Sequence, residues 1–197
     1  MRATLLLILA VISVEPCGRL EAQSNWLTEA MSLGRTRDDA LFESFNKSYS
    51  LSASGTIDQA EVVTEFRRAV LIVRERARHA DYAFGADDLA RALVPYRGLV
   101  TFIVQVRLNP LNVFIKEPAY HLYIRTGPTS PPIAPAMMKR DAMYPPGGQP
   151  GGPAVAVRLE GSFPRAAIEG APSPMLIVTD EKAEVLWQAR IDLSRYR

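Results

Sequence analysis

The sequence contains little cysteine and little histidine. Its single cysteine is Cys17, and its two histidines are His79 and His121. One cysteine cannot form an intramolecular disulfide, and structural zinc sites usually take four cysteine or histidine ligands. Long apolar runs are also missing, because the one at Ala3–Val14 is shorter than the about 20 residues that a membrane-spanning helix needs. These absences exclude a disulfide-stapled fold and a Cys-ligated metal site.

The short apolar run has the pattern of a secretory signal peptide. Arg2 precedes the run, and polar and turn-forming residues follow it, as in the charged and apolar regions of such signals. Cleavage after Ala22 predicts residues 1–22 as the signal and leaves no cysteine or membrane span behind. Two alternatives are a lipid anchor on Cys17 and an uncleaved amino-terminal anchor. The predicted location is therefore secreted or periplasmic.

Charge of one sign is also lacking. The formal net charge is +2, and hydrophobic residues make up 48% of the chain, which is typical of a globular protein. The basic runs at 67–68 and 74–78 are interrupted or flanked by Glu65 and Glu75. Nucleic-acid-binding domains usually cluster their positive charge, so we predict a solvated helix face here and no nucleic-acid partner.

Two helices are predicted from apolar spacing. Apolar residues recur three and four positions apart over about 57–79, which predicts one long amphipathic helix. A short second helix is predicted from Asp87, its expected cap, to about Leu93, because Pro95 disfavours helical geometry at the preceding residue. The segment 23–55 is weakly patterned and is predicted to hold little regular structure.

Beyond Tyr96 the apolar period changes to two, which predicts β-strands. The clearest alternations cover Val100–Leu108 and 184–193, and the shorter predicted strands are 113–115, 120–125, 155–159 and 175–178. Short strands with proline- and glycine-rich turns are typical of antiparallel sheets. We therefore predict an α+β, mainly β domain over 56–197, built as an antiparallel β-sandwich or a partly open barrel.

Residues 127–153 differ from the rest in composition. The stretch contains eight of the fifteen prolines and five of the twelve glycines. Such a density disfavours both helix and sheet ladder, so the sequence predicts a long irregular excursion. Long loops on rigid scaffolds often carry function, and the excursion is the predicted contact element for an unknown protein or envelope partner.

No motif in the sequence identifies a reaction. We assign no catalytic, cofactor-binding or metal residue, and predict an exported, non-enzymatic domain that binds or scaffolds through its loops. The alternative is a hydrolase or metal-assisted enzyme that uses His121 with Glu117, or His79 with Asp81. Histidine beside a carboxylate is a common acid–base or metal-binding arrangement.

Overall fold

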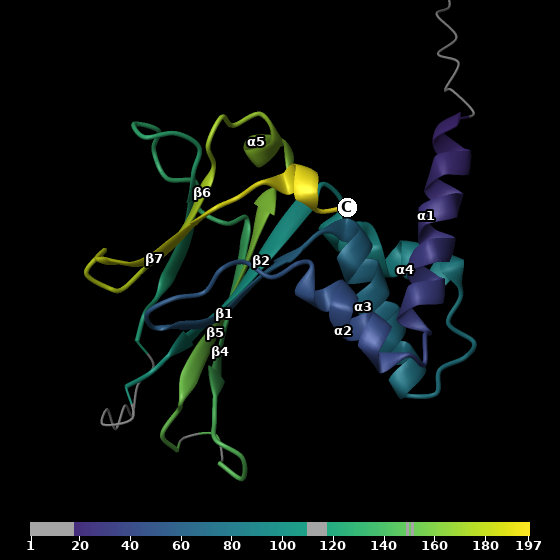
Figure 1. Cartoon of the computed structure of the whole chain (residues 1–197), viewed down its shortest axis with the longest axis horizontal. Helices are drawn as coiled ribbons and strands as arrows, with labels where there is room; N and C mark the ends of the chain where they lie inside the picture. The colour runs from purple at the N-terminus through teal and green to yellow at the C-terminus, as the bar shows by residue number, and fades with distance from the viewer. Residues whose placement is uncertain (1–17, 110–117, 149, 151) are drawn as a thin grey trace, which may run out of the picture.

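A computed structural model describes residues 18–109, 118–148, 150 and 152–197, with side chains from Asn25 onward. In these residues the chain has an α+β fold, with four of its five helices gathered beside the strands (Figure 1). The helices are α1 (Gly18–Gly34), α2 (Asp39–Lys47), α3 (Glu65–Arg78), α4 (Ala86–Leu93) and α5 (Ala166–Glu169). The strands are β1 (Ile57–Val63), β2 (Leu99–Arg107), β3 (His121–Arg125), β4 (Met137–Met143), β5 (Ala156–Pro164), β6 (Met175–Thr179) and β7 (Val185–Arg190).

The strands form two antiparallel sheets. One sheet has the order β1-β2-β5-β4 and the other the order β3-β6-β7. The two sheets confirm an α+β class with antiparallel strands, as predicted. β2, β3, β5, β6 and β7 all overlap strands predicted from alternation. The predicted strand at 113–115 lies outside the described residues. The helix count differs from the prediction, since the described residues hold five helices instead of two.

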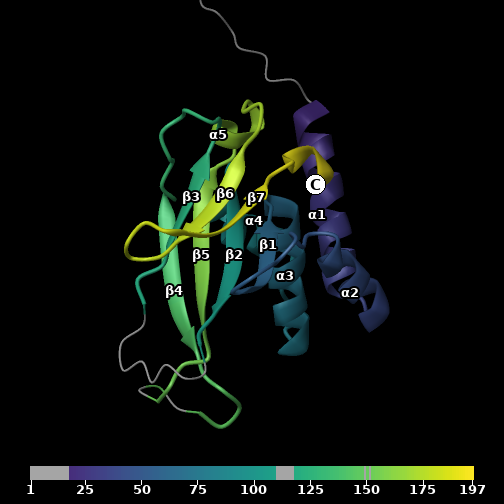
Figure 2. The same cartoon turned by 60° about the vertical axis from the view of Figure 1, so that its left-hand side comes forward.

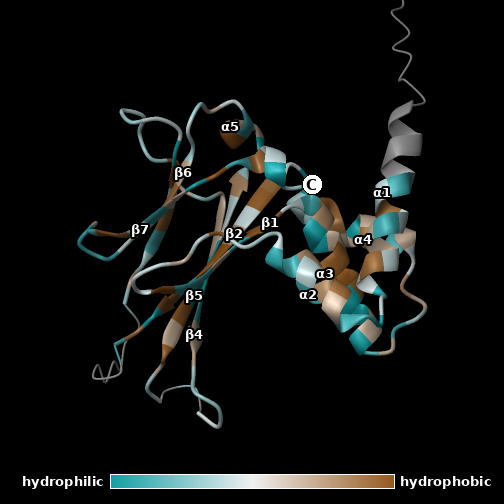
Figure 3. Cartoon of the chain, in the orientation of Figure 1, coloured by the Kyte–Doolittle hydropathy of each residue, from teal (hydrophilic) through white to brown (hydrophobic). Residues whose placement is uncertain are grey.

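Both sheets contribute to one hydrophobic core. The rings of Phe102 and Phe163 meet edge to face there, with centroids 5.9 Å apart. Gly161 allows the opposite sheet to approach closely, because a Cβ at this position would lie 2.7 Å from Cδ2 of Leu122. Apolar residues recur along these strands and along α3 in Figure 3. The alternation seen in the sequence thus marks the faces that the two sheets bury.

The predicted helix over 57–79 is wrong at its beginning. Residues 57–63 form strand β1, which pairs antiparallel with β2, and α3 starts only at Glu65. The backbone N–H and C=O groups of β1 form hydrogen bonds with β2, which replace the hydrogen bonds that a helix would supply. Thr64 marks the change, because its Oγ1 accepts a hydrogen bond from the backbone N–H of Arg67 at 3.3 Å and so caps α3.

Helices α1 to α4 pack around a second apolar core beside the sheets (Figures 1 and 2). α1 and α2 occupy much of the segment 23–55, where the sequence predicts little regular structure. Gly34 lets the end of α1 touch α3, because a Cβ there would lie 2.6 Å from Cβ of Val73. No described helix is long and apolar enough to cross a membrane.

The short predicted helix is present as α4, but its cap differs from the prediction. Gly85 is the capping residue, and Asp88, not Asp87, supplies the capping carboxylate. Oδ2 of Asp88 accepts the backbone N–H of Gly85 at 2.9 Å. A carboxylate three positions into a helix can reach back to the residue before the helix in this way.

The excursion at 127–153 is not irregular throughout, which corrects the prediction. Its central residues 137–143 contain neither proline nor glycine, and they form β4 along the edge of the four-stranded sheet. Before β4, Ile133 forms an isolated bridge with Ile124 of β3. The segment is therefore attached to both sheets, because the prolines and glycines flank the strand instead of interrupting it.

Candidate functional site

His79 does not pair with Asp81 as predicted. It caps the carboxyl end of α3, where its Nε2 lies 2.9 Å from the Glu75 carboxylate. Asp81 instead forms an ion pair with Arg76 at 3.5 Å. The His79 side chain is 72% exposed, which is typical of a basic residue that interacts with the negative end of a helix.

His121 lies on a different element, at the start of β3. Its ring stacks on Tyr123 with centroids 6.0 Å apart, and its Nδ1 lies 3.4 Å from a guanidinium nitrogen of Arg140. Glu117, its predicted partner, lies outside the described residues. Within the part of the chain that the structure describes, no three His, Cys, Asp or Glu side chains are grouped so that they could hold a metal ion.

A cleft of about 790 Å³ is lined by residues of α5 and of the segments around it. We call this cleft the terminal cleft. Figure 2 shows α5 at the upper end of the sheets. Two stretches of chain form the terminal cleft: 165–174, which contains α5 and the loop after it, and 190–195, which runs from the end of β7 through the turn at 193–195. Its polar side chains are those of Arg165, Glu169, Arg190, Asp192, Ser194 and Arg195.

Apolar side chains also line the terminal cleft. Ile168, Ile191 and Leu193 all border it and are at most 7% exposed. Ile191 is fixed by its backbone N–H, which donates to the Pro174 carbonyl at 2.8 Å. Apolar walls with a few convergent polar groups are typical of binding sites for small organic ligands.

The three arginines of the terminal cleft differ in their pairing. Nε of Arg165 donates to the Glu169 carboxylate at 2.5 Å, so this guanidinium already has a counterion. Arg190 and Arg195 are exposed, and among the described residues neither guanidinium has a hydrogen-bond or ion-pair partner. Two charged forks are therefore free to bind an anionic group.

The remaining carboxylate, Asp192, is occupied by its own turn. Its Oδ1 accepts the hydroxyl of Ser194 at 2.6 Å and the backbone N–H of Ser194 at 3.1 Å. These hydrogen bonds, helped by the nearby positive charges of Arg195 and Arg190, lower the pKa of Asp192 below its ordinary value of 3.8. Asp192 is therefore ionised at neutral pH and holds the turn in shape.

A second hollow of about 300 Å³ adjoins the terminal cleft. The two share Arg190, Asp192 and Arg195, which stand between them. On its other side the second hollow is lined by Trp187, Tyr196 and the serine-rich segment 50–54. The free arginines can thus be reached from two adjoining hollows.

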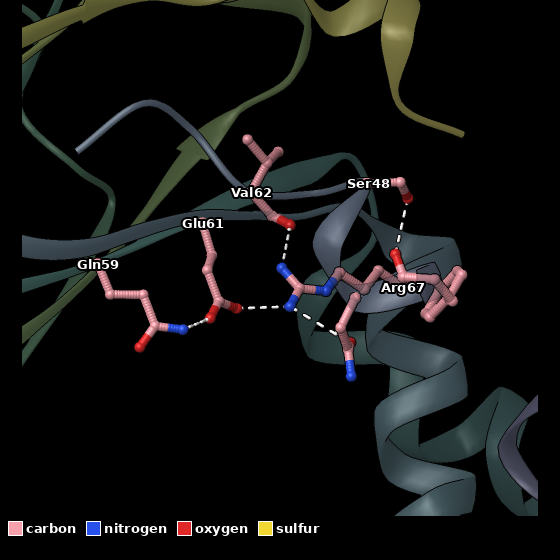
Figure 4. A network of polar contacts seen from close by, with 7 residues as sticks. Ser48, Gln59, Glu61, Val62 and Arg67 are labelled. Carbon is pink, nitrogen blue, oxygen red and sulfur yellow. Dashed lines mark hydrogen bonds and ion pairs between the residues drawn. The ribbon is translucent and has the colours of Figure 1, made fainter. Parts of the chain in front are cut away.

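A buried arginine supports the wall of the second hollow. Arg67 is 3% exposed and contacts Glu61 at 2.5 Å, the Val62 carbonyl at 2.7 Å and the Asn46 side chain at 3.4 Å (Figure 4). Its guanidinium also lies 5.2 Å from the ring centre of Tyr49. Tyr49 in turn stacks on Tyr196 with centroids 5.6 Å apart, so this network positions a residue that lines the hollow.

Sequence reasoning missed the terminal cleft. Arg165, Arg190 and Arg195 are separated along the chain, and none of them belongs to a recognisable motif. The local signal that was present is the Asp192–Ser194 turn after the last strand, since aspartate often bonds to the backbone two residues on. That signal indicates a turn and says nothing about which arginines converge on it.

No family model, curated protein sequence or solved structure matches this chain. The chemistry of the terminal cleft therefore rests on its own residues. Two unpaired guanidiniums beside buried apolar side chains can hold a molecule that has both an anionic group and an apolar part.

Proposed function

We propose that this protein is an exported binding domain, and that the terminal cleft holds an organic carboxylate such as the carboxyl-terminal end of a peptide. Unpaired Arg190 and Arg195 beside the apolar wall carry this proposal. Export is proposed from the signal-like residues 1–22. A β-sandwich formed by the two sheets that share a core is the proposed scaffold.

The charge balance of the terminal cleft favours a carboxylate as the ligand group. Its three guanidiniums face two carboxylates, those of Glu169 and Asp192. One net positive charge matches a single carboxylate better than a dianion, and an arginine fork binds a carboxylate through two parallel hydrogen bonds. Ile168, Ile191 and Leu193 would contact the apolar part of the ligand.

The polar groups of the terminal cleft favour binding over catalysis. Ser194 donates its hydroxyl to Asp192, and none of the described residues that line the cleft is a histidine. A nucleophilic serine needs an adjacent general base that is itself oriented by a third group. The arrangement supports a domain that holds its ligand through loops. This proposal places the ligand at the terminal cleft, and a partner contact at 127–153 stays a separate prediction.

The proposal is tested by calorimetric titration with a short apolar peptide as its free acid and as its carboxyl-terminal amide. We expect the acid to bind at least tenfold more tightly, because charge-assisted hydrogen bonds contribute about 1.5–3 kcal/mol each. Arg190→Ala and Arg195→Ala should each weaken binding of the acid by about tenfold or more. Arg125→Ala, which removes an exposed arginine of β3 outside the cleft, should leave binding unchanged.

Equal binding of the acid and the amide would contradict the proposal, and so would equal losses in all three variants. The first result would show that the carboxylate is not recognised, and the second that only the overall charge matters. Failure of both peptides to bind at millimolar concentration would also overturn it.

A further inference from the structure

A separate hollow lined by basic residues lies among the helices. It encloses about 300 Å³ between the loop that follows α1 and the carboxyl-terminal half of α3. Four arginines line it, together with one carboxylate, that of Asp39, and the ring of Tyr82. We call it the arginine hollow; its arginines are Arg35, Arg37, Arg74 and Arg78.

Two of these arginines are held in place by the fold. Nη2 of Arg35 donates to the Phe84 carbonyl at 2.7 Å. Arg74 donates to the carbonyl of Thr36 and to the carboxylate of Asp39, and its guanidinium lies 4.6 Å from the ring centre of Phe42. These contacts fix two positive charges at the hollow before any anion binds. Fewer side chains then lose conformational freedom on binding, which favours the bound state.

The other two arginines are free. Arg37 and Arg78 are exposed, and among the described residues neither guanidinium has a hydrogen-bond or ion-pair partner. Among the described residues that line the hollow, Asp39 is the one carboxylate beside four guanidiniums, and Arg74 already binds it. The arginine hollow therefore has an excess of three positive charges, whereas the terminal cleft has an excess of one.

Stabilisation of the helix end explains only part of this arrangement. Basic residues in the last turn of a helix interact favourably with its dipole, which accounts for Arg78 in α3. Arg35 and Arg37 follow the carboxyl end of α1, where the dipole of that helix also favours positive charge, but neither of them belongs to α3. Their convergence with α3 is what makes the hollow positively charged.

We propose that the arginine hollow binds a phosphate group, as a phosphomonoester or a pyrophosphate. Planar guanidinium forks match the geometry of phosphate oxygens, and several forks are suited to a group that carries two or more negative charges. Tyr82 stands at the hollow with 75% of its surface exposed. An aromatic or sugar portion attached to the phosphate can pack against this ring.

Calorimetric titration of the full chain with inorganic pyrophosphate tests the proposal. Arg37→Ala and Arg78→Ala should each weaken pyrophosphate binding by about tenfold or more. Arg97→Ala removes an exposed arginine in the turn that precedes β2, outside the hollow, and should change binding less than twofold. Arg78→Lys keeps the charge but loses the fork, so it should lie between the wild type and Arg78→Ala.

Vesicles that contain phosphatidic acid, measured with the same variants, separate a lipid source from a free one. Binding to either probe supports phosphate recognition if it depends on Arg37 and Arg78: pyrophosphate alone indicates a free phosphate compound, and vesicles alone a lipid headgroup. Absence of binding to both probes overturns the proposal, as does an equal loss in Arg97→Ala. Arg190→Ala should leave pyrophosphate binding intact, which separates this result from any failure at the terminal cleft.

Discussion

Glu61→Gln tests how much the ion pair between buried Arg67 and Glu61 contributes to the stability of the fold. The Arg67 side chain is 3% exposed and that of Glu61 18%, so water screens the pair poorly. Two unit charges about 4 Å apart attract by about 4 kcal/mol at an effective dielectric of 20. Glutamine keeps an oxygen that can accept a hydrogen bond from Arg67, and the partial exposure of Glu61 reduces the loss. We therefore expect the free energy of unfolding to fall by about 2 kcal/mol.

The assay is urea unfolding at pH 7, followed by tryptophan fluorescence. Trp187 contributes to this signal from the core that the two sheets share, where it is 5% exposed, and Trp26 contributes from the helical core. The matched control is Asp141→Asn, which neutralises a carboxylate in the surface pair with Lys139, where the side chains are 44% and 68% exposed. Surface pairs contribute about 0–1 kcal/mol. If Glu61→Gln costs no more than Asp141→Asn, the reasoning is refuted.

A second comparison isolates the pair itself. In the background Arg67→Met there is no buried positive charge, so Glu61→Gln should then cost less than about 0.5 kcal/mol. An equal cost in both backgrounds would mean that Glu61 acts through its other contact, the hydrogen bond from Gln59. If Arg67→Met does not fold, the comparison of Glu61→Gln with Asp141→Asn still tests the reasoning.

Two further predictions concern the cap of α4 and the core. The hydrogen bond from the backbone N–H of Gly85 lowers the pKa of Asp88 below 3.8 in the folded chain. The unfolded chain therefore takes up a proton on Asp88 more readily, and stability should be lost as the pH falls through the folded pKa. Asp88→Asn should remove this part of the pH dependence in acid unfolding curves. Gly161→Ala should destabilise by about 1–3 kcal/mol because its Cβ would meet Leu122. The control Gly170→Ala, where nothing lies within 4 Å of the added Cβ, should change the urea midpoint little; equal effects would contradict this account.

Two anion sites of different charge have a consequence for experiments with this protein. The terminal cleft has one excess positive charge and an apolar wall, whereas the arginine hollow has three excess positive charges and one exposed ring. Binding at the arginine hollow should therefore weaken more steeply with salt, since screening acts on each exposed charge. Titrations at two ionic strengths can assign a new ligand to one site or the other.

Elements whose pattern is local could be predicted from the sequence alone. Alternation in β2 and β7 reflects strands that bury one face, so the period of two is present whatever the neighbouring strand is. The apolar stripe of α3 is likewise local, and the sequence predicted that helix although it misplaced its first residue. Class, approximate strand positions and the short helix α4 followed from such patterns.

Tertiary structure decided the rest, because it depends on partners distant in the chain. Ile57–Val63 became a strand because β2 pairs with it along most of its length, and β4 formed among prolines because β5 accepts an edge strand. The arginines of the terminal cleft and of the arginine hollow converge only after the sheets and helices pack. The spacing of arginines along the sequence does not indicate which of them pair with a carboxylate, so only the folded chain shows which guanidiniums remain unpaired.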